Sequence, residues 1–222
     1  MSFTRKLAAE FIGTAGLLTI VVGSGIMGER LSSGNSAVAL LGNSIATGAG
    51  LIILIYGFSN ISGAHFNPVV TLMEAFDGKI GRMESFCYLT AQVAGAVLGV
   101  VIANLMFELH AINLSTKTRE GEAQFLGEFV ATFGLIGVIR LGTAFHPKHV
   151  GAMVAFYITA AYWFTSSTSF ANPAVTVARS LSNTFAGIAP SSVPMFIAAQ
   201  FVGAITAMFV FKWLLAEKEN DD

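Results

Sequence analysis

Residues 169–180 read SFANPAVTVARS, and an earlier stretch, residues 65–75, reads HFNPVVTLMEA. Asparagine is a favoured N-cap of a helix, and proline is favoured as the first helical residue because its missing N–H is no loss there. Each Asn-Pro pair is therefore expected to begin a short helix. Aligned on these pairs, the stretches match Asn67 with Asn172, Pro68 with Pro173, Val69 with Ala174, Val70 with Val175 and Thr71 with Thr176. The expected helices run from Pro68 to about Phe76 and from Pro173 to about Leu181.

The composition is that of a membrane protein. Of the 222 residues, 54% are hydrophobic and 11% are charged, and the mean hydropathy is +0.70. Soluble domains carry about a quarter of their residues as charges. The net charge of −1 and the lack of a basic run exclude nucleic acid as a partner. No pattern in the sequence requires a cofactor or a metal.

Six stretches reach the roughly 20 apolar residues that a spanning helix needs. They lie at about 7–28, 37–59, 83–107, 124–143, 149–167 and 192–215. Basic residues concentrate on one side of this arrangement, which predicts a multi-pass protein of the plasma membrane or inner membrane with both termini in the cytoplasm. That side holds Arg5, Lys6, Lys79, Arg82, Arg140, Lys148, Lys212 and Lys218, whereas Arg30, Lys117 and Arg119 lie on the other.

The two halves of the chain repeat each other. Residues 10–14 (EFIGT) match 128–132 (EFVAT), and residues 91–96 (AQVAGA) match 199–204 (AQFVGA). We place the first repeat at about 4–107 and the second at about 124–215, within one domain. Each repeat has three spans, and because three is odd the halves are inserted in opposite orientations. The fold class is therefore an all-α membrane protein, with six spanning helices and two re-entrant half-helices whose N-termini meet near the middle of the membrane.

These motifs resemble those of a known channel family. Residues 61–71, ISGAHFNPVVT, and 170–176, FANPAVT, are similar to the paired Asn-Pro-Ala loops of the aquaporin, or major intrinsic protein, family. The first loop departs from the family pattern at Val69, whereas Ala174 matches it. The resemblance implies one pore per subunit, a homotetramer in the lipid bilayer and passive flow of small neutral molecules. No nucleophile, acid–base pair or metal cluster accompanies His65, so we do not expect an enzyme.

The resemblance also assigns roles to individual residues. Asn67 and Asn172 are expected to offer N–H donors to a solute, and His65 to line the cytoplasmic half of the pore. An acceptor ladder of backbone carbonyls is expected from Gly63, Ala64, His65, Thr168, Ser169 and Phe170. Glu10 and Glu128 fall inside spans, where a carboxylate is costly unless satisfied. They either brace the loops, as the family suggests, or relay protons or sodium ions, which would make the protein an ion-coupled secondary transporter using Glu10, Glu128 or His65.

Family channels narrow at four positions near the outer mouth. Counting from Asn67 and Asn172, without insertions in the helices, places Thr47, Ala160, Ser169 and Val175 there. Val175 stands where members of the family often carry arginine. These residues predict a wide mouth without a fixed charge, which passes water, glycerol, urea and undissociated metalloids such as arsenite or boric acid. A bacterial subgroup with a similar arginine-free filter is associated with the movement of arsenicals, including organic ones.

Arg179 follows Val175 by four residues, about one helical turn of roughly 6 Å. We expect it above the constriction, in the outer vestibule, packed or paired with Glu108, Glu120 or Glu122. A second alternative for the whole protein is a structural or adhesive membrane protein with a blocked pore.

Overall fold

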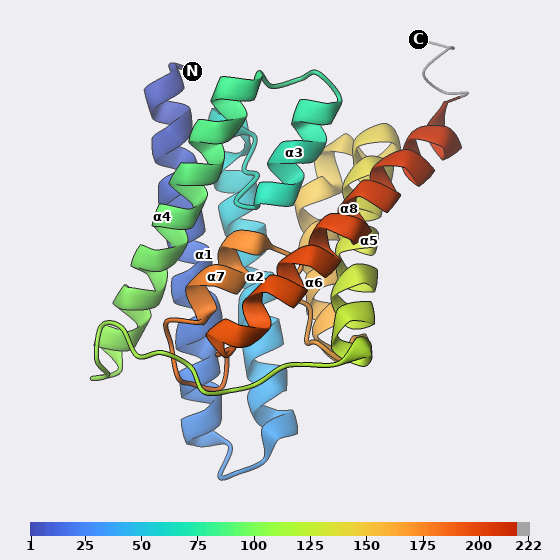
Figure 1. Cartoon of the computed structure of the whole chain (residues 1–222). Helices are drawn as coiled ribbons and strands as arrows, with labels where there is room; N and C mark the ends of the chain where they lie inside the picture. Colours follow the sequence, from blue (N-terminus) through green and yellow to red (C-terminus); the bar gives the residue numbers. More distant parts are fainter. Residues whose placement is uncertain (217–222) are drawn as a thin grey trace.

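The computed structural model describes residues 1–216; Lys218 and the acidic tail at 217–222 lie outside the described residues. The chain is all-helical, and its long helices stand side by side around two short ones (Figure 1). Within residues 1–216, five helices are long and apolar enough to cross a membrane. The long helices are α1 (Phe3–Leu31), α2 (Ser36–Ser62), α4 (Arg82–Met106), α5 (Glu122–Phe145) and α8 (Val193–Leu215).

The fifth expected span, residues 149–167, is shorter than the sequence predicts. Helix α6 covers Val150–Phe164, only 15 residues, after the 3₁₀ turn η1 (Pro147–His149). At 1.5 Å per residue it rises roughly 22 Å, less than the roughly 30 Å of a hydrocarbon core. Residues 165–167 already belong to the loop that leads to Asn172. The expected span of 149–167 therefore ran three residues too far, because it included Thr165, Ser166 and Ser167.

The two Asn-Pro pairs begin short helices. Helix α3 covers Pro68–Phe76, and Asn67 caps it by accepting a hydrogen bond from the N–H of Val69. Helix α7 covers Pro173–Arg179, two residues shorter than expected. In Figure 1, α3 lies at the end of the molecule that holds the N-terminus, and α7 lies deeper in the bundle.

Glycines on α4 and α8 let pairs of long helices approach closely. A Cβ atom at Gly95 or Gly99 of α4 would overlap backbone oxygens of α1, at Phe11 and Ala15. In the second half, a Cβ at Gly203 of α8 would overlap the carbonyl of Phe129 in α5. Small residues at such positions allow helices to pack in lipid, where packing itself drives association. The pairs α1/α4 and α5/α8 are thus built alike.

Both ends of the described chain lie at the same end of the bundle (Figure 1). Ion pairs hold the elements together there: Lys6 of α1 contacts Glu84 of α4 at 3.0 Å, and Arg140 of α5 contacts Asp77 at 2.6 Å. The loop of residues 107–121 crosses the opposite end, below α8 in Figure 1.

Candidate functional site: a central pore

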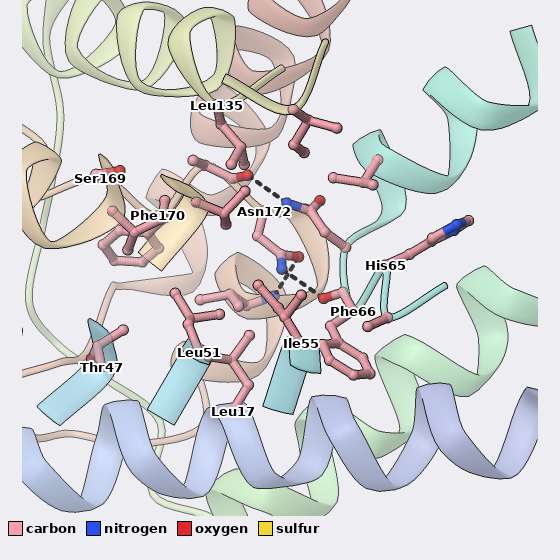
Figure 2. A pocket seen from close by; sticks show the side chains of 18 of the residues that line it. Leu17, Thr47, Leu51, Ile55, His65, Phe66, Leu135, Ser169, Phe170 and Asn172 are labelled. Carbon is pink, nitrogen blue, oxygen red and sulfur yellow. Dashed lines mark hydrogen bonds between the residues drawn. The ribbon is translucent and has the colours of Figure 1, made fainter. Parts of the chain in front are cut away.

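A cavity of about 320 Å³ runs between the half-helices and the long helices. It extends from Glu74 and Lys79, at the end that holds the termini, to Arg179 toward the other end. Much of the lining is aliphatic, and Figure 2 shows Leu17, Leu51 and Ile55 on one side of the cavity with Leu135 across from them. The aliphatic lining consists of Leu17, Val21, Leu51, Ile55, Val70, Leu135, Ile139, Val150, Val154, Ile158 and Val175.

The two asparagines hold the half-helices together at the cavity. The side-chain N–H of Asn67 donates to the carbonyl of Ala171 at 2.8 Å, and that of Asn172 donates to the carbonyl of Phe66 at 2.8 Å (Figure 2). Their side-chain oxygens cap their own helices, so each amide is used on both sides. An amide nitrogen carries two hydrogens. Each asparagine therefore keeps a second side-chain N–H that is not used in the bond to the other loop. Both residues line the cavity.

Glu10 and Glu128 are fully buried and each binds the loop of its own half. Glu10 accepts hydrogen bonds from the backbone N–H groups of His65 and Phe66, at 3.0 and 2.8 Å, and from the hydroxyl of Ser62 at 2.6 Å. In the second half, Glu128 accepts from the N–H groups of Phe170 and Ala171, at 2.8 and 2.9 Å. Within residues 1–216, every hydrogen-bond partner of these two side chains is a donor, so the carboxyl oxygens act as acceptors.

Two glutamines complete this network, and our reading of the sequence did not single them out. Gln92 donates to Glu10 at 2.8 Å and to the hydroxyl of Thr71 at 2.9 Å. Gln200 does the same for Glu128, at 2.6 Å, and for Thr176, at 2.8 Å. The repeated AQ pair of residues 91–92 and 199–200 was the signal that could have identified them.

The loops before Asn67 and Asn172 contain residues with left-handed backbone, which leaves several carbonyl groups outside helical hydrogen bonding. Residues Ala64 and Phe66 have φ of 53° and 49°, and the matching Ser169 and Ala171 have 49° and 47°. Such left-handed backbone costs about 1–3 kcal/mol per non-glycine residue, and the glutamate hydrogen bonds offset this cost. Within residues 1–216, no hydrogen bond reaches the carbonyl groups of Gly63, Ala64, His65, Thr168, Ser169 and Phe170. These carbonyls therefore keep unused acceptor capacity.

Three of the four expected filter residues line this cavity and one does not. Thr47, Ser169 and Val175 line it, and each is buried. The prediction that Ala160 lines the constriction is wrong, because its side chain is exposed on the outer surface of α6. Successive residues of a helix are 100° apart, so the inward face of α6 that carries Ile158 and Tyr162 points away from Ala160. Counting back from Asn172 therefore selected a residue on the outward face of α6. The count crosses the irregular loop of residues 165–171, which determines how α6 is rotated about its axis.

The wall therefore contains an aromatic ring and a fixed charge that we did not expect there. The hydroxyl of Tyr162 lies 3.2 Å from that of Thr47. Arg179 is only 2% exposed and its guanidinium carbon lies 3.5 Å from the centre of the Phe170 ring. Its Nε donates to the carbonyl of Ala186. None of the expected partners Glu108, Glu120 and Glu122 forms an ion pair with Arg179, so of the two alternatives for this residue the ion pair is wrong and the packed side chain agrees with the structure. The prediction of a mouth without a fixed charge is wrong, because Arg179 lines the cavity.

The remaining expected residues divide between two cavities. Gly63, Ala64, His65 and Phe170 line the central one. The Nδ1 atom of His65 lies 3.0 Å from the hydroxyl of Thr71, which fixes the ring. Thr168 instead borders a second cavity on the outer side.

Comparison with known proteins agrees with this architecture. The Major intrinsic protein family model matches residues 1–166. The chain is 50% identical to an aquaglyceroporin, AqpS, of Rhizobium meliloti (strain 1021), over 96% of this chain and 91% of that protein. It is 30% identical to Aquaporin NIP1-4 of Oryza sativa subsp. japonica, over 100% of this chain and 82% of the other.

A solved structure shares the fold. The X-ray structure of the aquaglyceroporin from Plasmodium falciparum superposes with a TM-score of 0.75 at 18% identity, and the match covers 100% of both chains. The fold is therefore that of the aquaporins, as the doubled Asn-Pro motif predicted. The chain belongs to the major intrinsic protein family, a family of passive membrane channels for water and small solutes rather than of enzymes.

Proposed function

We propose that the central cavity conducts small neutral polyhydroxy and amide solutes, such as glycerol and urea, together with water and undissociated metalloid hydroxides such as arsenite or boric acid. The observation that carries this proposal is the mixed lining of the cavity. Aliphatic side chains make up much of it, and polar atoms come from Asn67, Asn172 and backbone carbonyl groups that accept no hydrogen bond within residues 1–216. A solute with both carbon atoms and several hydroxyl groups fits such a lining, because burying its carbon atoms and pairing its hydroxyls are both favourable.

The outer end of the cavity supports a preference for solutes larger than water. Hydroxyl groups come from Thr47, Tyr162 and Ser169, and the hydroxyl oxygen of Ser169 is buried without a partner within residues 1–216. Phe170 adds an aromatic face. Val175 leaves space beside Asn172, where an arginine would fill the path. The chain's 50% identical relative is called an aquaglyceroporin, which agrees with this preference. We include organic arsenicals among the proposed solutes, because they too are small neutral molecules with hydroxyl groups.

An ion-coupled transporter is less well supported by the same geometry. Such a protein needs carboxylates that bind and release an ion during transport. Glu10 and Glu128 are fully buried, and the donors around them tie each to its loop. His65 is held by Thr71. We infer that these groups brace the pore and that the flow is passive.

We further propose that the protein is a homotetramer with both termini in the cytoplasm. The repeats, about 4–107 and 124–215, then place α3 in the cytoplasmic half and α7 in the outer half of each pore. Native mass spectrometry of the protein in lipid nanodiscs tests the tetramer, and a protease added outside intact cells tests the termini. A monomer or cleavage of an external terminal tag would contradict these two statements.

Permeability measurements test the proposed solutes. Purified protein in phosphatidylcholine vesicles is exposed to gradients of glycerol, urea or mannitol, and light scattering follows swelling, while arsenite uptake is measured by mass spectrometry. We expect faster entry of glycerol, urea and arsenite than into empty vesicles, with mannitol excluded. Equal rates in both kinds of vesicle would support a blocked, structural protein instead.

A further inference from the structure

A second cavity of about 430 Å³ lies at the end of the molecule opposite the termini. Two of its cationic residues, Lys117 and Arg119, belong to the loop before α5, and the third, Arg179, belongs to α7. Arg179 also lines the central pore, so the two cavities share this side chain. The other lining residues carry no acid: Ser36, Ala37, Leu40, Asn43, Trp163, Thr168 and Phe185.

The two guanidinium groups are held by neutral partners. Arg119 donates through Nε to the carbonyl of Gly187 at 3.1 Å, and its Cζ lies 5.1 Å from the centre of the Phe170 ring. Arg179 stacks on the same ring and donates through Nε alone. In the part of the chain that the structure describes, no carboxylate pairs with either arginine, and the terminal nitrogens of Arg179 form no hydrogen bond.

Lys117 adds a third positive charge. Its ammonium group donates to the carbonyl of Phe185 at 2.8 Å and lies 4.8 Å from the centre of that ring. Loss of surrounding water, and then the charges of Arg119 and Arg179, lower the pKa of Lys117 to about 8, and Glu29 of α1 opposes this shift. Glu29 is itself engaged by the N–H of Phe185 at 3.2 Å. The cations are thus near enough to repel one another.

We propose that the outer cavity, defined by Lys117, Arg119 and Arg179, binds a small soluble oxyanion. Planar guanidinium groups suit oxyanions because they present several donors to two oxygen atoms at once. Arg179 is 2% exposed, so only a ligand small enough to enter the cavity reaches it, which favours a free anion over a headgroup attached to a lipid. This inference rests on the proposed channel function in one respect: an anion bound against Arg179 narrows the outer end of the pore and slows neutral solutes.

Sulfate is the probe, because its charge is constant from pH 6 to 10. Binding of radiolabelled sulfate to the detergent-solubilised protein is measured by equilibrium dialysis for wild type, Lys117→Gln and Lys148→Gln. Lys148 is an exposed lysine near the opposite end and serves as the control. We expect about 10-fold weaker binding for Lys117→Gln, the effect of losing one charged hydrogen bond, and unchanged binding for Lys148→Gln.

The pH dependence has a defined sign. Lys117 carries its charge below a pKa of about 8, so sulfate affinity falls as the pH rises from 7 to 8.5. The facing charges are Arg119, Arg179 and Glu29, and a guanidinium keeps its charge over this range. In Lys117→Gln the fall disappears. A fall of the same size in wild type and Lys117→Gln would overturn the assignment to this cavity.

Flux measurements separate the anion site from the channel function. Glycerol entry into phosphatidylcholine vesicles, which hold no anionic headgroup, is measured with increasing sulfate and normalised to each protein's sulfate-free rate. Sulfate should slow wild type and Lys148→Gln at concentrations several-fold lower than those needed for Lys117→Gln. Glycerol flux without saturable sulfate binding would overturn the anion site alone, whereas sulfate binding without glycerol flux would overturn the channel function alone.

Discussion

Thr47 and Tyr162 come from different helices, and their hydroxyl oxygens lie 3.2 Å apart in the wall of the pore. Counting from Asn67 identified Thr47 because α2 leads into the first loop without an irregular insertion. The same counting from Asn172 selected Ala160 and missed Tyr162. The rotation of α6 depends on how residues 165–171 fold against Glu128 and Arg119, and these are contacts between residues far apart in the sequence.

Truncation of Tyr162 should widen the pore. We expect Tyr162→Ala to raise the permeability of the four-carbon polyol erythritol relative to that of glycerol by several-fold, because the ring and its hydroxyl leave the wall. Vesicle swelling in the two polyols measures this ratio. Ala160→Phe is the matched control on the same helix, and it should leave the ratio unchanged because residue 160 faces outward. A ratio that changes in Ala160→Phe but not in Tyr162→Ala would show that residue 160, and not residue 162, lines the constriction.

Val175→Arg should close the path to larger solutes. A guanidinium beside Asn172 fills the space that valine leaves, so we expect at least about a 10-fold loss of glycerol permeability, or about 1.4 kcal/mol, with water flow retained. The new charge also lies one turn from Arg179 and repels it. Val175→Met, of similar length without the charge, separates bulk from charge, and thermal unfolding checks the fold. Unchanged glycerol flow through folded Val175→Arg would show that residue 175 does not border the constriction.

At the scale of elements, local chemistry determines where the half-helices begin but not where they end. Asn-Pro determines the first residue of α3 and α7 through capping, which depends on neighbours in the sequence. Helix α7 stops at Arg179 because the carbonyls of Ser180 and Leu181 accept hydrogen bonds from Ser115 and Asn113 of a distant loop, both near 3.0 Å. No pattern within residues 172–182 predicts that pairing.

Replacing Glu128 by glutamine should loosen the second loop. The amide offers one acceptor oxygen and one donor nitrogen where the carboxylate accepts from Phe170, Ala171 and Gln200. A buried donor without a partner costs about 1–3 kcal/mol. We therefore expect a clearly lower thermal unfolding temperature in detergent for Glu128→Gln, whereas Glu120→Gln, in an exposed loop, should unfold like wild type. A normal unfolding temperature for Glu128→Gln would contradict the bracing role.

The packing of α1 on α4 should be sensitive to one added methyl group. A Cβ at Gly99 would overlap the carbonyl of Ala15, so we expect Gly99→Ala to destabilise the protein by about 1–3 kcal/mol, the usual cost of overpacking. Gly57→Ala is the matched control, because a Cβ there meets no atom within 4 Å. Thermal unfolding of both variants measures the difference, and equal stabilities would show that α1 and α4 can separate without cost.

At the scale of the whole molecule, the aquaporin fold could be predicted because its signals occur twice. The pairs EFIGT/EFVAT and AQVAGA/AQFVGA mark positions that become Glu10 with Gln92 and Glu128 with Gln200, side chains that meet across each half. The outer mouth was not predictable in the same way. Lys117 and Arg119 come from the loop of residues 107–121, which has no counterpart in the repeat, and Arg179 of α7 stands where the first half has Glu74.

The central claim is that this folded pore carries neutral solutes passively, and one measurement tests it directly. Glycerol entry into phosphatidylcholine vesicles is followed with and without an imposed pH gradient, beside empty vesicles. We predict a rate well above that of empty vesicles, unchanged by the gradient, with glycerol reaching the same concentration on both sides. Accumulation of glycerol against its gradient, or a rate equal to that of empty vesicles, would contradict the account.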